Sequence, residues 1–180
     1  MPRLYTRRGD DGTTGLLGPG RASKADPRLE AMGAVDELNA ALGVALAVQQ
    51  DPRIRSALLK VQDDLFTVGA ELASVGKTKS KLPRVSPEYT ARLEGILEEL
   101  DTGPVTEFLL PRGSESIVRL HWARTVARRA ERRAVALARK DRLNPEVLRY
   151  LNRLSSLLYQ MALWTLKQEG ATPAHPSYGE

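Results

Sequence analysis

The stretch RLHWARTVARRAERRAVALARK, from Arg119 to Lys140, carries two patterns with one helical period. Apolar residues recur every three or four positions, as they do along one face of an α-helix. Arg124, Arg128 and Glu131 stand at i, i+4 and i+7, so they share a second face. The apolar face consists of Leu120, Ala123, Ala127, Ala130, Ala134 and Leu137. Alanine lets helices approach closely, so the stretch predicts a tightly packed bundle helix with charges at the border of its core.

Helical periodicity also appears before and after this stretch. A capping residue followed by proline opens four segments: Asp26-Pro27, Asp51-Pro52, Ser86-Pro87 and Asn144-Pro145. The expected helices cover residues 27–48, 52–75, 87–100, 114–140 and 145–168. Since no segment reads convincingly as a sheet strand, the sequence predicts an all-α protein, a ferritin-like five-helix bundle with up-and-down helices. We expect one domain over residues 1–180, with an N-terminal arm (1–25) and a flexible C-terminal tail (170–180).

The composition limits the possible chemistry. The 180 residues include no cysteine, which excludes disulfides, thiolate zinc sites and cysteine nucleophiles. The two histidines, His121 and His175, do not have metal-ligand spacing. No apolar run reaches the roughly 20 residues of a membrane span, and the N-terminus lacks the apolar region of a signal peptide. We therefore expect a cytoplasmic protein without a membrane partner.

The net charge of +5 favours anionic partners without identifying them. The row formed by Arg124, Arg128 and Glu131 has two interpretations of about equal weight: a solvated face with ion pairs, or a clamp for a triphosphate. Asp36, on the first helix, could pair with one of these arginines. The last helix carries a polar line formed by Asn152, Ser155 and Tyr159. The pattern alone favours hydrogen bonds between helices as the role of these side chains.

The segment YTRRGDDGTTGLLGPGRASK, from Tyr5 to Lys24, is rich in glycine but lacks the spacing of the common phosphate loop. It could be a flexible arm, because glycine, aspartate and threonine are frequent in loops. The backbone N–H groups of such a loop can also surround phosphate oxygens. Together with the arginine-rich helix, the segment indicates a polyphosphate ligand.

Four segments resemble the PduO-type cob(I)alamin adenosyltransferases, in that family's order and across nearly the whole chain. They are TRRGDDGTTGL with the following SK, VDELN (35–39), RTVARRAER (124–132) and LNRLSSLLY (151–159). The resemblance implies a homotrimer of five-helix bundles that binds ATP between subunits. It also implies transfer of the 5′-deoxyadenosyl group of ATP to Co(I) of a corrinoid such as cobalamin, with release of triphosphate.

The resemblance further implies roles for individual residues. Arg128, Asp36, Arg124, Asn152 and Glu131 would be the catalytic group, and Glu131 and Asn152 would help to place the nucleotide and its Mg²⁺. The ATP site would comprise Thr6, Arg7, Arg8, Gly9, Asp10, Gly12, Thr13, Thr14, Gly15, Lys24, Arg128, Arg129, Glu131, Arg132 and Asn152. Asp36 and Arg124 match a family salt bridge near the corrinoid. Phe108 matches an aromatic residue that presses on the lower corrin face and eases reduction of Co(II) to Co(I).

The chain departs from the family pattern at Arg112, Ser156, Tyr159 and Leu163, which lie toward the expected corrinoid side and in the last helix. Two alternative functions are also compatible with the residues. The first is a helical nucleic-acid-binding module, disfavoured by the acidic residues within the basic row. The second is a carrier that binds a corrinoid or nucleotide without catalysis. The resemblance favours the enzyme, with ATP and a reduced corrinoid as its partners and no nucleic acid.

Overall fold

The computed structural model describes residues 5–74, 83–105, 107 and 109–177. Within these residues the chain forms five helices: α1 (Pro27–Leu46), α2 (Pro52–Ala73), α3 (Pro87–Glu99), α4 (Glu115–Ala138) and α5 (Pro145–Gln168). Their number and order confirm the sequence prediction, and the largest boundary difference is two residues, as where α1 ends at Leu46 instead of Val48. Among the described residues, no helix combines the length and the apolar composition of a transmembrane segment.

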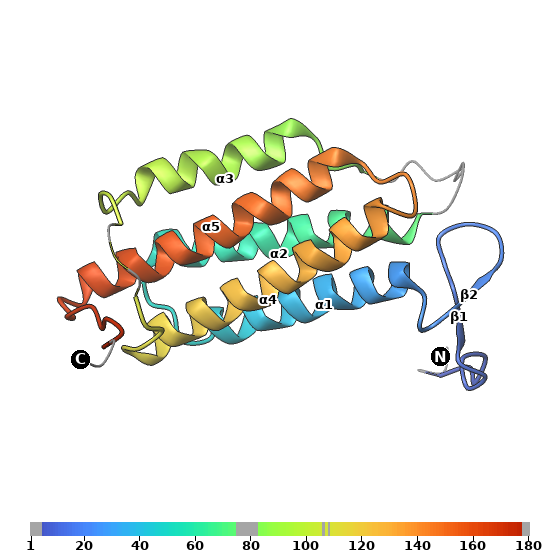
Figure 1. Cartoon of the computed structure of the whole chain (residues 1–180), viewed down its shortest axis with the longest axis horizontal. Helices are drawn as coiled ribbons and strands as arrows, with labels where there is room; N and C mark the ends of the chain where they lie inside the picture. Colours follow the sequence, from blue (N-terminus) through green and yellow to red (C-terminus); the bar gives the residue numbers. More distant parts are fainter. Residues whose placement is uncertain (1–4, 75–82, 106, 108, 178–180) are drawn as a thin grey trace.

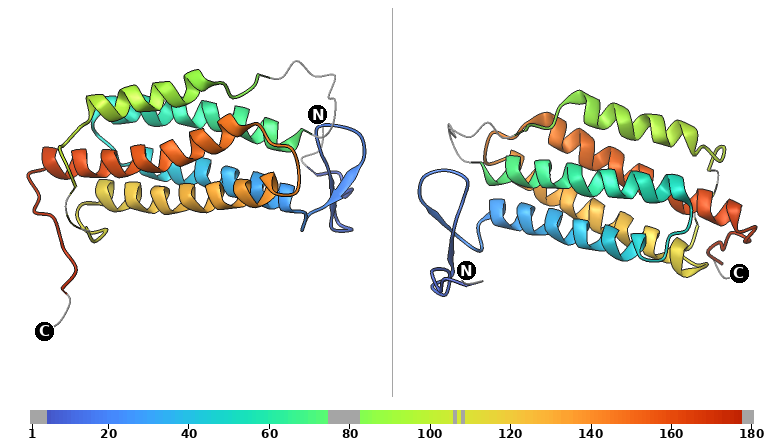
Figure 2. Two further views of the ribbon diagram at one scale, coloured as in Figure 1. Left: turned by 45° about the horizontal axis from the view of Figure 1, so that its top comes forward. Right: turned by 180° about the vertical axis from the view of Figure 1, so that it is seen from behind.

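The helices run in alternating directions and lie side by side (Figures 1 and 2), which confirms the expected bundle. Helix α4 packs against both α1 and α5, while α3 covers the outer side of α5. The predicted apolar face of α4 is confirmed, since Ala123, Ala127, Ala130 and Ala134 are all fully buried. The core around them is filled mainly by leucine, valine and alanine.

The caps expected from the sequence begin the helices. Asp26, Asp51 and Asn144 each accept a hydrogen bond from a backbone N–H of the first helical turn. Ser114 does the same for α4, through Ile117 N at 3.4 Å. Ser86 occupies the cap position of α3 without such a bond. The capping residues therefore fix where the helices start and hence which residues each face presents.

The N-terminal arm contains a small sheet that the sequence analysis did not predict. Strands β1 (Thr13–Gly15) and β2 (Arg21–Ser23) pair antiparallel. Three-residue strands are too short to show the alternation that identifies a strand in a sequence. Lys24 Nζ donates to Gly9 O at 2.8 Å, which folds the first part of the arm onto the hairpin. The hairpin is held to the bundle where Leu17 N donates to Ala73 O at 3.0 Å.

Arg28 fixes the end of the bundle that carries this arm. Its guanidinium is buried and donates to the backbone oxygens of Leu72 and Ser74, the latter at 3.1 Å, at the C-terminal end of α2. It also forms an ion pair with Asp141, just after α4. One side chain thus satisfies orphan carbonyls of α2 and joins three helices where the arm enters the bundle.

A second buried polar group attaches α3 to the bundle. The carboxylate of Asp64, on α2, is only 1% exposed and lies 2.7 Å from Arg92 of α3 and 3.1 Å from Lys60. The hydroxyl of Tyr150, on α5, donates to the same carboxylate at 3.2 Å. Burial, and then the negative charge of Asp64, raise the pKa of Tyr150 well above its usual value. Asp64 therefore acts as the common acceptor for three helices.

We predict that Asp64→Asn lowers the free energy of unfolding by about 2–3 kcal/mol, because the neutral amide leaves the two cations without their buried partner. The shift should appear in the midpoint of urea unfolding with an unchanged m value. The neighbouring exposed residue supplies the control: Asp63→Asn should change the stability by less than about 0.5 kcal/mol. Equal effects of the two substitutions would contradict the role assigned to Asp64.

Candidate functional site

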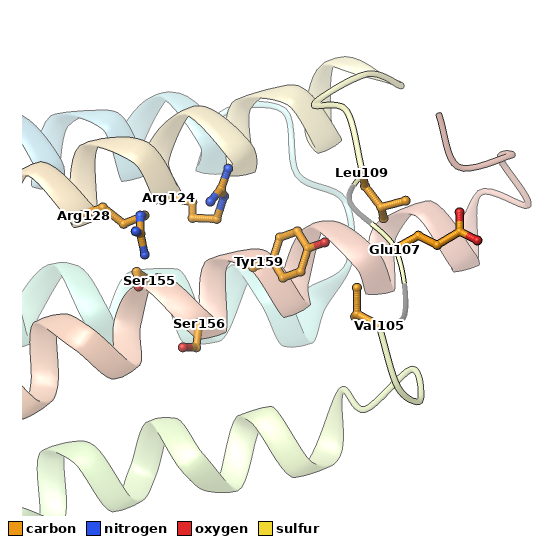
Figure 3. Close-up of a pocket in the computed structure, with 8 residues that line it drawn as sticks. All are labelled: Val105, Glu107, Leu109, Arg124, Arg128, Ser155, Ser156 and Tyr159. Carbon is orange, nitrogen blue, oxygen red and sulfur yellow. The ribbon is translucent and has the colours of Figure 1, made fainter. Parts of the chain in front are cut away.

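Two pockets meet along the groove between α4 and α5. The first, called here the loop-side pocket, has a volume of about 450 Å³ and is closed at one end by the connection between α3 and α4 (Figure 3). It is lined by Val105, Glu107, Leu109, Arg124, Arg128, Ser155, Ser156 and Tyr159. The second, called here the arginine pocket, also measures about 450 Å³. It is lined by Arg128, Glu131, Arg132, Val135, Ala136, Arg139 and Asn152. Arg128 lines both pockets.

The arginine pocket has the chemistry of an anion site. Arg128 and Arg132 stand one turn apart on α4, Arg139 is its C-cap residue, and all three are exposed. The side-chain amide of Asn152 donates to Glu131 Oε1 at 2.8 Å, which ties the pocket wall on α5 to the one on α4. Guanidinium groups bind phosphate oxygens through parallel hydrogen bonds, so three of them can surround a polyphosphate. The predicted residues Arg128, Glu131, Arg132 and Asn152 are thus brought together.

The loop-side pocket is less polar and contains a partly buried cation. Arg124 Nε is buried without a hydrogen-bond partner among the described residues, and its guanidinium lies 5.5 Å from the centre of the Tyr159 ring. The ring of the buried His121 packs against the same tyrosine, 5.8 Å between centres. Burial, and then the charge of Arg124, lower the pKa of His121, so this imidazole stays neutral at pH 7. Ser155 Oγ donates to Asn152 O within α5 at 2.9 Å.

The acidic residues of α1 pair with other arginines than the sequence suggested. Glu37 forms an ion pair with Arg129, and Glu30 lies 3.6 Å from Arg133. Asp36 is exposed, and within the described part of the chain it forms no ion pair with Arg124. Arg129 therefore contacts α1 and lines neither pocket. The ion pair between Asp36 and Arg124 does not form within a single chain, and it remains a prediction.

The arm lies beyond the end of the bundle at which α4 ends (Figures 1 and 2). None of its described residues lines either pocket, so one chain does not bring Thr6–Gly15 and Lys24 next to Arg128. Arm residues instead line a cavity of about 380 Å³ with Leu137 and Lys140 at the end of α4. Phe108 lies outside the described residues, although its sequence neighbours Glu107 and Leu109 line the loop-side pocket.

Some pocket residues were not selected from the sequence. Arg139 and Val135 continue the same helical row as Arg128, at i+11 and i+7, so extending the period by two turns would have found them. Val105, Glu107 and Leu109 come from an irregular connection, where no period exists to point to them. Among the residues that the structure describes, no group of three or more acidic or histidine side chains could hold a metal ion.

Comparison with known proteins identifies the family. Residues 4–165 match the family model described as cobalamin adenosyltransferase. A corrinoid adenosyltransferase of Citrobacter freundii is 43% identical over 165 residues, which cover 90% of this chain and 94% of that protein. The PduO corrinoid adenosyltransferase of the same species is 44% identical over 162 residues, 88% of this chain, but this chain spans only about half of its length, 48%.

A solved structure supports the same relationship. It is a variant of the PduO-type ATP:corrinoid adenosyltransferase from Lactobacillus reuteri, complexed with cobalamin and ATP. It superposes with a TM-score of 0.90 at 30% identity and covers 97% of this chain and 99% of its own. The family match over most of the sequence and the agreement of the fold lead to one conclusion: the chain belongs to the cobalamin adenosyltransferase family.

Proposed function

We propose that this protein is an ATP:cob(I)alamin adenosyltransferase, which makes adenosylcobalamin and triphosphate. The observation that carries the proposal is the adjoining position of the two pockets, with Arg128 in the wall of both. A reaction between a polyphosphate nucleotide and a large second substrate needs such neighbouring sites. The related Lactobacillus reuteri protein binds both cobalamin and ATP, which supports this pairing of substrates.

In the proposed arrangement the triphosphate of ATP occupies the arginine pocket and the corrinoid the loop-side pocket. The Co(I) substrate attacks the ribose C5′, a Co–C bond forms, the C5′–O bond breaks, and triphosphate leaves with the bonding electrons. Arg128 stands where charge develops on the leaving oxygen, and Arg132 and Arg139 add positive charge. Glu131, fixed by Asn152, would help to place Mg²⁺ with the phosphates. The protein supplies position and charge, and forms no covalent intermediate.

We further propose that the functional unit is a homotrimer in which the arm of one subunit completes the ATP site of the next. Within one chain the described part of the arm lies beyond the end of α4 (Figure 1), and Arg128 stands ten residues before that end, about 15 Å along the helix axis. On α1, Gly33, Asp36 and Ala40 form an exposed stripe of small side chains, and none of the described helices covers it. Such a stripe allows the close approach of a second subunit, to which Asp36 would offer a partner for Arg124.

Arg128→Ala should lower kcat for adenosylcobalamin formation by about 100- to 1000-fold, because it removes a donor aimed at the leaving triphosphate. The assay is anaerobic and uses ATP, Mg²⁺ and chemically reduced cobalamin, with the product followed by its absorbance. Arg133→Ala, an exposed arginine of the same helix outside both pockets, is the matched control and should retain activity. The absence of product from the wild-type chain would refute the proposed function, and a fully active Arg128→Ala variant would refute the role of this residue.

Mixing two defective variants tests the shared site. Lys24→Ala and Arg128→Ala should each be nearly inactive, whereas trimers refolded from equal amounts of both should regain about one quarter of the wild-type activity. The recovery follows because one site in four then combines an intact arm with an intact helix. Sedimentation velocity reports the mass of the assembly. If the mixed sample stays inactive although its subunits exchange, the arm and the arginine do not act in one site across subunits.

Phe108→Ala should slow adenosylation more when the reaction starts from cob(II)alamin and a reductant than when cob(I)alamin is supplied. The reason is that an aromatic side chain against the lower corrin face would disfavour the lower axial ligand and ease the reduction step. The ratio of the two rates measures the effect. Leu109→Ala, which alters the adjoining pocket residue, should lower both rates alike. An equal loss of both rates in Phe108→Ala would indicate a packing role.

A further inference from the structure

The connection that closes the loop-side pocket is held from behind by the end of the chain. Glu107 Oε2 lies 3.0 Å from His175 Nδ1, and Leu110 N donates to Ala174 O at 2.8 Å. Farther along, Ser114 Oγ donates to Glu169 Oε1 at 2.8 Å. As the connection advances from residue 107 to 114, its partners recede from 175 to 169, so the two irregular segments run antiparallel to each other.

This contact lies on the far side of the pocket wall. In Figure 3 the carboxylate of Glu107 points away from Arg124 and Arg128, toward the C-terminal segment. A cavity of about 470 Å³, called here the tail cavity, lies between that segment and the wall. Val105, Glu107 and Leu109 line both the loop-side pocket and the tail cavity, so a single segment of the chain separates the two. The position of the wall residues in the loop-side pocket therefore depends on what supports the wall from the tail cavity.

Few other interactions fix this wall. Within the described part of residues 103–113, the bond from Leu110 N to Ala174 O is the one backbone hydrogen bond to a different segment of the chain. Helix α5 contributes Leu163 and Leu166 to the tail cavity, while Ala171, Pro173 and His175 line it from the C-terminal segment. Removal of the segment would leave the wall without its antiparallel partner.

We propose that residues 171–177 form a positioning strap for the corrinoid site, in which His175 and the Ala174 carbonyl hold the pocket wall against the bound corrinoid. The inference rests on the proposed function, since it assigns the corrinoid to the loop-side pocket. The inference predicts a selective effect on corrinoid binding. The strap contacts Glu107 and Leu110, and neither residue lines the arginine pocket. The strap therefore acts on the corrinoid and leaves nucleotide binding unchanged.

The test compares two truncations of the full chain. Ending the chain after Gly170 removes the strap, and ending it after Ser177 keeps every contact described above. We expect the first truncation to weaken cob(II)alamin binding in the presence of ATP by about tenfold, and His175→Ala or Glu107→Ala to weaken it by about threefold. The dissociation constant for ATP should change by less than about twofold in all of them. Absorbance titration measures the first quantity and calorimetry the second.

Two further measurements separate positioning from general destabilisation. Hydrogen exchange at the Leu110 amide should accelerate in the truncation after Gly170, while amides in the middle of α4 keep their protection. In the His175→Ala background, Glu107→Ala should add little further loss, because the two side chains act as one pair. Unchanged cobalamin binding after removal of the strap, or an equal loss of ATP and cobalamin affinity, would overturn the inference.

The outcomes also distinguish this inference from the proposed function. A wild-type chain that binds cobalamin and ATP but forms no adenosylcobalamin would refute the proposed enzymatic activity. The cobalamin affinities of the truncated chains would still test the strap. A wild-type chain that forms product while the truncation after Gly170 binds cobalamin normally would refute the strap alone. A wild-type chain that binds no cobalamin would refute both.

Discussion

The packing of the alanine face of α4 between α1 and α5 is the constraint on which the site depends. Ala123, Ala127, Ala130 and Ala134 are fully buried, so the backbone of α4 lies close to both neighbouring helices. The arginine row begins one position along the helix from this face, and the packing therefore aims it at the groove beside α5. Any larger side chain on the alanine face would push α4 outward and move every guanidinium at once. The positions of the site residues are thus set by the smallest residues in the core.

Ion pairs then divide five arginines of the C-terminal half of α4 and its cap into two groups. Arg129 and Arg133 are engaged by Glu37 and Glu30, so their positive charge is largely balanced within the bundle. Arg128, Arg132 and Arg139 have no carboxylate within ion-pair distance in the described part of the chain, and they share one pocket. A basic surface spread over the whole helix would suit a nucleic-acid backbone. A local excess of charge in a pocket suits a compact polyphosphate, such as the triphosphate of ATP that the proposed function places there.

Features that follow the helical period could be predicted from the sequence, whereas contacts between irregular segments could not. Helix boundaries and the buried alanine face followed from capping residues and from a period of about 3.6. The grouping of Arg128, Glu131 and Asn152 in one site came from the family resemblance. The hairpin of the arm and the pairing of residues 107–114 with 169–175 could not be predicted, because short irregular segments carry no period and their contacts join distant parts of the chain. The partner of Arg129 was missed for another reason: Glu37 and Asp36 are adjacent, and only the rotation of α1 about its axis decides which carboxylate faces α4.

The departures from the family pattern fall on one side of the site. Ser156 and Tyr159 line the loop-side pocket, and Leu163 lines the tail cavity. Arg112 lies in the connection between α3 and α4. The arginine pocket contains none of the four. A triphosphate presents the same oxygens to every enzyme that binds it, so its pocket needs the same donors at the same places. An apolar wall can repack around a large ligand when several neighbouring residues change together. The loop-side pocket, to which the proposed function assigns the corrinoid, is therefore where this protein has room to differ from its relatives.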